Sequence, residues 1–136
     1  MGSLKTREST LITELDRNSP VVEAYRTLRT NLKFVNVDRI LRRVLITSPG
    51  PGEGKSTIAA NLSVVLAQAG KKVITCSVDL RRPTLHEYFG LNNRKGVTNI
   101  LAGQHTIDEC LQEVGIPNLR FLASGPNPPN PAELLG

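Results

Sequence analysis

A glycine-rich segment at residues 50–57, Gly50-Pro51-Gly52-Glu53-Gly54-Lys55-Ser56-Thr57, separates two apolar stretches of the chain. The β-branched run before it, residues 43–48, is typical of a short buried strand. After it, apolar side chains recur at helical spacing up to the stop signal Gly70, namely Ile58, Ala59, Leu62, Val65, Leu66 and Ala69. Strand, glycine-rich turn and helix in this order are the setting of a phosphate-binding loop. The chain is therefore predicted to have an α/β fold of the P-loop NTPase type, a parallel sheet flanked by helices.

The residue types in this segment suit the binding of nucleotide phosphates. Gly52 and Gly54 allow backbone conformations in which successive N–H groups turn inward around an anion. Lys55 can reach the β- and γ-phosphates, and Ser56 can offer its hydroxyl to a magnesium ion. The segment matches G-x-x-x-x-G-K-[ST] except that Pro49 stands at the first glycine position, and the spacing excludes a dinucleotide fingerprint. We predict that ATP contacts the loop residues Gly50, Gly52, Glu53, Gly54, Lys55, Ser56 and Thr57.

A second strand is predicted over residues 72–78, directly after the helix, and Asp79 follows it. Strand, helix and strand in succession imply a right-handed parallel crossover, and parallel sheets bind ligands at the carboxyl ends of their strands. Asp79 can there hold a magnesium-bound water or accept a hydroxyl proton. We predict Lys55 and Asp79 as catalytic residues, and Ser56 and Asp79 as the residues nearest to Mg²⁺. The alternative role for Asp79 is to cap the turn that follows it.

The start signal of an amphipathic helix is Ser19 followed by Pro20. Its apolar residues recur at spacings of four and three: Val21, Tyr25, Leu28, Leu32 and Val35. A cationic stripe runs beside them, consisting of Arg26, Arg29 and Lys33. Such a helix suits either a contact between subunits or docking within its own chain.

The domain boundary is predicted between residues 18 and 19. Residues 1–18 are polar and carry no sustained period, so we expect a flexible arm with at most a short ordered piece at Leu11 and Ile12. Further along, short helices are predicted over 97–101 and 107–114 and a third strand over 118–124. A chain of 136 residues is short for a doubly wound fold, so we expect the sheet of domain 19–136 to lack its C-terminal strands.

The formal charge of +5 is concentrated in the first half of the chain. This excess suits a nucleotide, an acidic partner or an anionic lipid surface, and a solvated basic face is equally compatible with it. No apolar run approaches the roughly 20 residues of a membrane span. Cys76 and Cys110 have no metal-ligand spacing, so we expect reduced thiols in a cytoplasmic protein. We expect no nucleic-acid partner.

Four segments together resemble the bacterial tyrosine kinases of capsule and exopolysaccharide synthesis. Residues 47–57 resemble the Walker A motif of that family, and Val78-Asp79-Leu80-Arg81-Arg82-Pro83 resembles its second Walker motif. Glu23-Ala24-Tyr25-Arg26 is similar to its N-terminal helix signature, and residues 128–135 to its proline loop. The resemblance implies an ATP- and Mg²⁺-dependent kinase that autophosphorylates on tyrosine and regulates polysaccharide export.

The same resemblance implies partners and a location. In the family the N-terminal helix packs subunits into a ring, which assigns an oligomer interface to Glu23, Tyr25, Arg26 and Arg29. The usual partner is a membrane-anchored activator, a polysaccharide co-polymerase, which would hold the kinase at the inner face of the cell membrane.

The sequence departs from the family pattern at three places. The second Walker motif normally reads Asp-x-Asp, whereas here Ser77 takes the first position; the Walker B strand and the tyrosine-rich tail are also missing. We therefore expect a truncated domain with feeble transfer activity. Two alternatives remain open: a nucleotide-binding ring component without transfer activity, and a partitioning or division-site ATPase, which carries an early loop lysine where this chain has Gly50.

Overall fold

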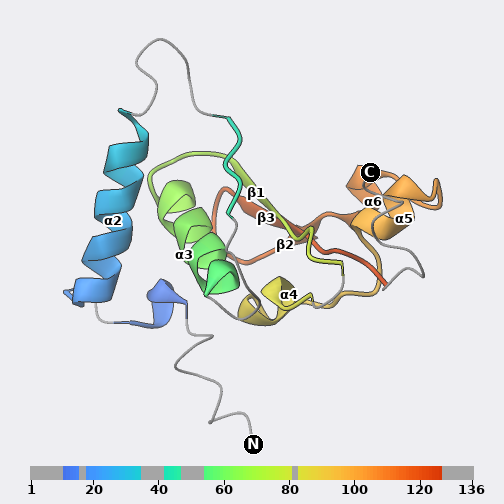
Figure 1. Ribbon diagram of the computed structural model, residues 1–136, viewed down its shortest axis with the longest axis horizontal. Helices are drawn as coiled ribbons and strands as arrows, with labels where there is room; N and C mark the ends of the chain where they lie inside the picture. Colours follow the sequence, from blue (N-terminus) through green and yellow to red (C-terminus); the bar gives the residue numbers. More distant parts are fainter. Residues whose placement is uncertain (1–10, 16–17, 35–41, 47–53, 81–82, 127–136) are drawn as a thin grey trace, which may run out of the picture.

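The computed structural model describes residues 11–15, 18–34, 42–46, 54–80 and 83–126. The helices and strands in these ranges follow one another along the chain in the order η2 (Ile12–Glu14), α2 (Pro20–Leu32), α3 (Lys55–Gln68), β1 (Val73–Cys76), α4 (Leu85–Tyr88), α5 (Val97–Leu101), α6 (Ile107–Cys110), β2 (Gln112–Glu113) and β3 (Leu119–Leu122). Helix α3 lies between α2 and the sheet, and α5 and α6 lie at the opposite end of the sheet from α2 (Figure 1). The predicted α/β fold is confirmed, with a small mixed sheet.

The two long helices begin where their sequence signals predict. The Ser19 side chain accepts a hydrogen bond from the N–H of Val21, and Pro20 occupies the first position of α2. Helix α3 begins after Gly54, whose φ of 77° lies in the left-handed region that glycine adopts without strain. Its last residue, Gln68, lies two residues before Gly70, which also has a positive φ.

The sheet has the order β1-β3-β2, in which β1 pairs parallel with β3 and β2 pairs antiparallel with it. Strands β1 and β3 confirm the strands predicted over 72–78 and 118–124, in a register that places Val73 beside Leu119 and Cys76 beside Leu122.

Three sequence-based expectations for secondary structure were wrong. Described residues 42–46 form no strand, and their side chains Val44 and Leu45 are exposed; residues 47–48 lie outside the described part. A strand exists only when a neighbour completes its hydrogen bonds, and within the described ranges no backbone hydrogen bond joins 42–46 to a neighbouring strand. The predicted crossover between 43–48 and 72–78 is therefore not seen. The helix predicted over 107–114 ends at Cys110 because Gln112–Glu113 pair with β3 instead. Helix α4 was not predicted.

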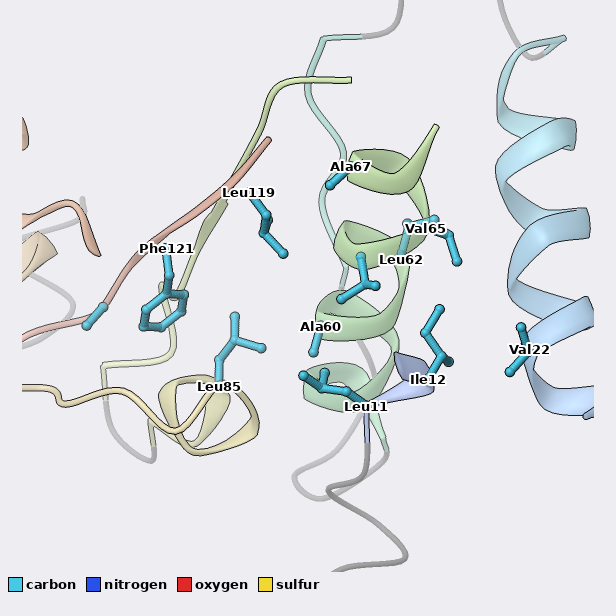
Figure 2. Packing of buried hydrophobic residues seen from close by; sticks show 12 residues of the cluster. Leu11, Ile12, Val22, Ala60, Leu62, Val65, Ala67, Leu85, Leu119 and Phe121 are labelled. Carbon is cyan, nitrogen blue, oxygen red and sulfur yellow. The ribbon is translucent and has the colours of Figure 1, made fainter. Parts of the chain in front are cut away.

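The core lies on both sides of α3 (Figure 2). Leu119 and Phe121 of β3 approach it from the sheet, and Val22 approaches it from α2. Leu11 and Ile12 are buried against its first half, where the short ordered piece was expected, and the Ile12 N–H donates to the buried Asn61 Oδ1 at 2.9 Å. Because α3 is covered on two sides, its buried residues run round most of the helix, as expected for a central element.

Candidate functional site

The candidate site lies at the N-terminus of α3, where it meets the segment that follows β1. A cavity of about 730 Å³ runs along α3 and β1 and reaches this point, with Leu66 and Lys72 lining its far end. At the N-terminus of α3 its lining includes Lys55, Ser56, Ser77, Asp79 and Thr84. The predicted loop residues Gly50, Gly52 and Glu53 lie outside the described part of the chain. Lys55, Ser56 and Asp79, which the sequence placed in two separate motifs, thus line one cavity.

Lys55 and Asp79 form an ion pair across this cavity. The Lys55 Nζ lies 3.6 Å from the Asp79 Oδ2, and each side chain is about one third exposed, at 35% and 36%. Lys55 is the first residue of α3, whereas Asp79 lies three residues beyond β1. A pair this exposed is screened by water and contributes little to folding, roughly 1 kcal/mol or less. The ion pair matters for the position of Lys55, because it holds the ammonium group next to Asp79 in the lining of the cavity.

The first turn of α3 itself carries no negative charge that would repel an anion. Gly54 makes no side-chain cap, and the first turn of this fully described helix contains no acidic residue. The first four N–H groups of a helix have no partner within the helix, and they lie at the positive end of its dipole. A 14-residue helix with an uncapped N-terminus, a lysine and two hydroxyls suits a phosphate group. These residues therefore fit the phosphates of a nucleotide.

The two hydroxyls beside Lys55 contact α4. The Ser56 Oγ lies 3.0 Å from the Thr84 Oγ1, and the Thr57 Oγ1 lies 2.7 Å from the Tyr88 Oη. Sequence reasoning missed Thr84 and Tyr88. Their spacing of four residues places them on one helical face, but that signal gains meaning only when the helix opposite is known.

Ser77 stands at the end of β1, where the resembling family carries an aspartate. It is buried, with 4% of its surface exposed, and its N–H donates to the Leu122 carbonyl at 2.9 Å. Two residues further on, Asp79 supplies the carboxylate nearest to Lys55. Among the described residues no group of three or more His, Cys, Asp and Glu side chains is arranged to hold a metal ion. Any Mg²⁺ here would be held mainly through phosphate oxygens and water, as is usual for nucleotide sites.

The residues predicted to form an oligomer interface lie on α2 and have partners within the chain. Arg26 pairs with Glu23 at 3.5 Å, and Tyr25 packs against the core. The Arg29 Nη1 donates to the Val65 carbonyl of α3 at 2.9 Å. Arg29 thus joins α2 to α3, which is the docking role that the sequence left open, and the subunit interface remains a prediction.

Cys76 lines the same cavity as Lys55 and Asp79, whereas Cys110 is not among the residues that line it. Both thiols are free; Cys76 is exposed, and Cys110 is buried. Burial raises the pKa of the Cys110 thiol, which keeps it protonated. In the described part of the chain, no helix is long and apolar enough to span a membrane.

The comparisons with known proteins agree on one family. A family profile described as AAA domain matches residues 42–127. Tyrosine-protein kinase YwqD of Bacillus subtilis is 53% identical over 113 residues, which cover 83% of this chain and 48% of the relative. The chain thus spans about half the length of that relative.

Solved structures support the same relationship. The chimerical protein CapA2B2 superimposes with a TM-score of 0.84 and 36% identity over 98% of this chain and 64% of that one. The septum site-determining protein MinD of Pyrococcus horikoshii, solved with Mg-ADP, is more distant, with a TM-score of 0.57 and 27% identity over 67% of this chain and 37% of its own. MinD has the same P-loop NTPase-like fold, but the match to CapA2B2 is better in TM-score, identity and coverage.

Proposed function

We propose that this chain, which belongs to the AAA domain family and is similar to proteins named tyrosine-protein kinase, forms the nucleotide-binding part of an ATP-dependent protein tyrosine kinase. The complete protein would autophosphorylate on tyrosine and regulate the synthesis and export of capsular or exopolysaccharide. The observation that carries the proposal is the 3.6 Å contact between Lys55 and Asp79, because it joins two separately predicted motifs at an uncapped helix N-terminus.

Each residue of the site has a proposed role. The amides at the start of α3 and the Lys55 ammonium hold the β- and γ-phosphates, while the Ser56 hydroxyl is a ligand for Mg²⁺. Asp79 lies beside the acceptor and takes the proton of its hydroxyl, or else holds a magnesium-bound water. Bound Mg²⁺ would neutralise charge on the phosphates. Gly50, Gly52, Glu53, Gly54 and Thr57 complete the phosphate loop.

A second candidate function follows from Ser77. A serine cannot carry the charge of the aspartate that the family places there, and loss of such a carboxylate costs a factor of about 10² to 10⁴ in rate. The chain would then bind ATP as a ring component with feeble transfer activity. In either case the proposed partners are further copies of the chain through α2 and a membrane-anchored activator, which would place it in the cytoplasm at the inner face of the membrane.

Two measurements test the proposal. Calorimetry with Mg-ATP should show binding by the parent chain and a loss of at least about tenfold for Lys55→Met, whereas the exposed Lys95→Met should bind like the parent. Equal affinity of parent and Lys55→Met contradicts the nucleotide site.

Labelled ATP with a tyrosine-rich peptide then separates the two candidates. Transfer that rises in Ser77→Asp supports a kinase weakened at this position. Binding without phosphotyrosine in either form supports the ring component.

A further inference from the structure

Helix α4 presents two hydroxyl groups to the first turn of α3. Thr84 precedes α4 as its N-cap residue, and Tyr88 is its last residue. Their oxygens lie 3.0 Å from the Ser56 Oγ and 2.7 Å from the Thr57 Oγ1, respectively. Two hydroxyls four residues apart thus meet two consecutive hydroxyls of the proposed phosphate loop.

The Thr84 hydroxyl is not used in the way that threonine is usually used at this position. An N-cap threonine normally accepts a hydrogen bond from an N–H in the first turn of its own helix. In α4 no such bond is made, and the side chain faces Ser56 instead. The contact to α3 therefore replaces a stabilising cap.

Each hydroxyl has one hydrogen to donate and lone pairs to accept with, so a hydrogen given to one neighbour is not available to another. A serine that binds a metal ion through oxygen uses a lone pair, and its hydrogen then requires an acceptor. A threonine that binds a phosphate must donate its hydrogen, because phosphate oxygens only accept, and its lone pair is then free to accept a further bond. Ser56 bound to a metal ion would therefore need a hydrogen-bond acceptor on its other side. Thr57 bound to a phosphate would be polarised by a hydrogen-bond donor on its other side.

We propose that α4 sets the direction of hydrogen bonding in the nucleotide loop: Thr84 accepts the hydrogen of Ser56, and Tyr88 donates to Thr57. This inference rests on the proposed nucleotide site. Ser56 then turns a lone pair toward the metal, and Thr57 turns its hydrogen toward a phosphate. Thr84 and Tyr88 are positioning residues, because each acts through a residue of α3.

The position of α4 suits this role because α4 is anchored to the core. Leu85 is buried, and the adjacent Phe89 packs on Phe121 of β3 with ring centroids 5.5 Å apart. The Tyr88 contact is partly buried, whereas the Thr84 contact is exposed to water. Water replaces an exposed bond more easily, so the effect of Tyr88 is expected to be the larger one.

The two positions predict different binding signatures. Calorimetry with ATP in excess EDTA reports phosphate binding alone, and a titration with Mg²⁺ at fixed ATP reports the metal. Tyr88→Phe should weaken ATP binding by roughly 2- to 10-fold with and without magnesium. Thr84→Val should leave magnesium-free binding unchanged and raise the Mg²⁺ midpoint by roughly 2- to 3-fold, and Thr84→Ser should restore the parent midpoint.

A matched control is available on α2. Thr30→Val makes the same chemical change as Thr84→Val away from the site and should behave like the parent. If Tyr88→Phe does not fold, Thr84→Val and its rescue by Thr84→Ser carry the test, because a merely structural role for α4 would not move the Mg²⁺ midpoint alone.

The possible outcomes distinguish a failure of the proposed nucleotide-binding function from a failure of this inference alone. A parent chain that does not bind ATP contradicts the proposed function and this inference together. A parent that binds, with Thr84→Val and Tyr88→Phe both unchanged, contradicts the inference alone. Equal weakening by both variants with and without magnesium also contradicts it, because that result assigns α4 a merely structural role.

Discussion

Replacement of Arg29 tests whether α2 serves its own chain or only a neighbouring subunit. The Arg29 Nη1 donates to the Val65 carbonyl at 2.9 Å, and the side chain is half-buried between α2 and α3. If this contact docks α2, Arg29→Ala must lower the free energy of unfolding of the single chain. If Arg29 acts only between subunits, that free energy must stay the same while assembly is lost.

The expected size follows from what remains after the substitution. A hydrogen bond from a charged group contributes about 1.5–3 kcal/mol when buried, and partial exposure reduces this to about 1–2 kcal/mol. The Val65 carbonyl also accepts from the Ala69 N–H at 3.1 Å, so Arg29→Ala leaves no unsatisfied acceptor to add a further cost. A loss of about 1–2 kcal/mol corresponds to a fall in Tm of roughly 2–8 °C for a chain of this size.

Urea unfolding at low protein concentration, combined with sedimentation, measures both properties. Arg94→Ala is the matched control, because Arg94 is exposed and lies outside α2 and α3, so its replacement should change the free energy of unfolding by about 0.5 kcal/mol or less. Arg29→Lys keeps the charge without the planar donor group and should recover only part of the loss. An Arg29→Ala chain with the parent's unfolding midpoint would refute the docking role.

Three further substitutions have defined outcomes. Asn61→Ala removes the acceptor of the buried Ile12 N–H and should cost about 1–3 kcal/mol in urea unfolding, with faster proteolysis ahead of α2. Gly96→Ala brings a Cβ into overlap with a backbone carbonyl after β3, so it should cost about 1–3 kcal/mol or more and lower Tm. Hydrogen bonds from the backbone and side chain of Thr106 lower the pKa of Glu109, so its contribution is present above the unfolded pKa and is lost as pH falls through the folded one. Glu109→Gln should therefore be less stable than the parent at neutral pH, and the difference should disappear as the pH falls through the folded-state pKa, as unfolding curves at decreasing pH would show.

The helices that begin with strong local signals were predicted correctly, and so were strands β1 and β3. The two segments whose prediction failed are ones in which pairing with a distant partner decides the structure. Helices α2 and α3 have a cap or a glycine at their start and sustained apolar spacing, which are properties of neighbouring residues. Residues 43–46 have the composition of a strand, but a strand also needs a neighbour. Gln112–Glu113 were predicted as helix and instead pair with β3, because pairing across the sheet outweighs the helical preference of a short segment.

The residues of the candidate site also fall into those that the sequence predicted and those that it did not. Lys55, Ser56 and Asp79 stand in motifs whose spacing encodes their chemistry, so the sequence was sufficient to expect them in one place. Thr84 and Tyr88 come from a four-residue helix that lacks a sequence signal of its own. Their relevance comes from the packing of α4 against α3, which the local sequence does not specify.

Directional contacts explain how α3 places Lys55 opposite Asp79. Apolar packing against α2 and the sheet is non-directional, so it leaves the rotation of the helix about its axis weakly specified. Polar contacts fix that rotation from four sides: Arg29 bonds Val65, the N-terminal segment bonds Asn61, Thr75 of β1 bonds Ser63, and α4 contacts the first turn. One residue of rotation is about 100°, which would turn Lys55 away from the cavity. The buried polar residues of α3, which a purely apolar core would not need, are therefore what keeps the lysine at the site.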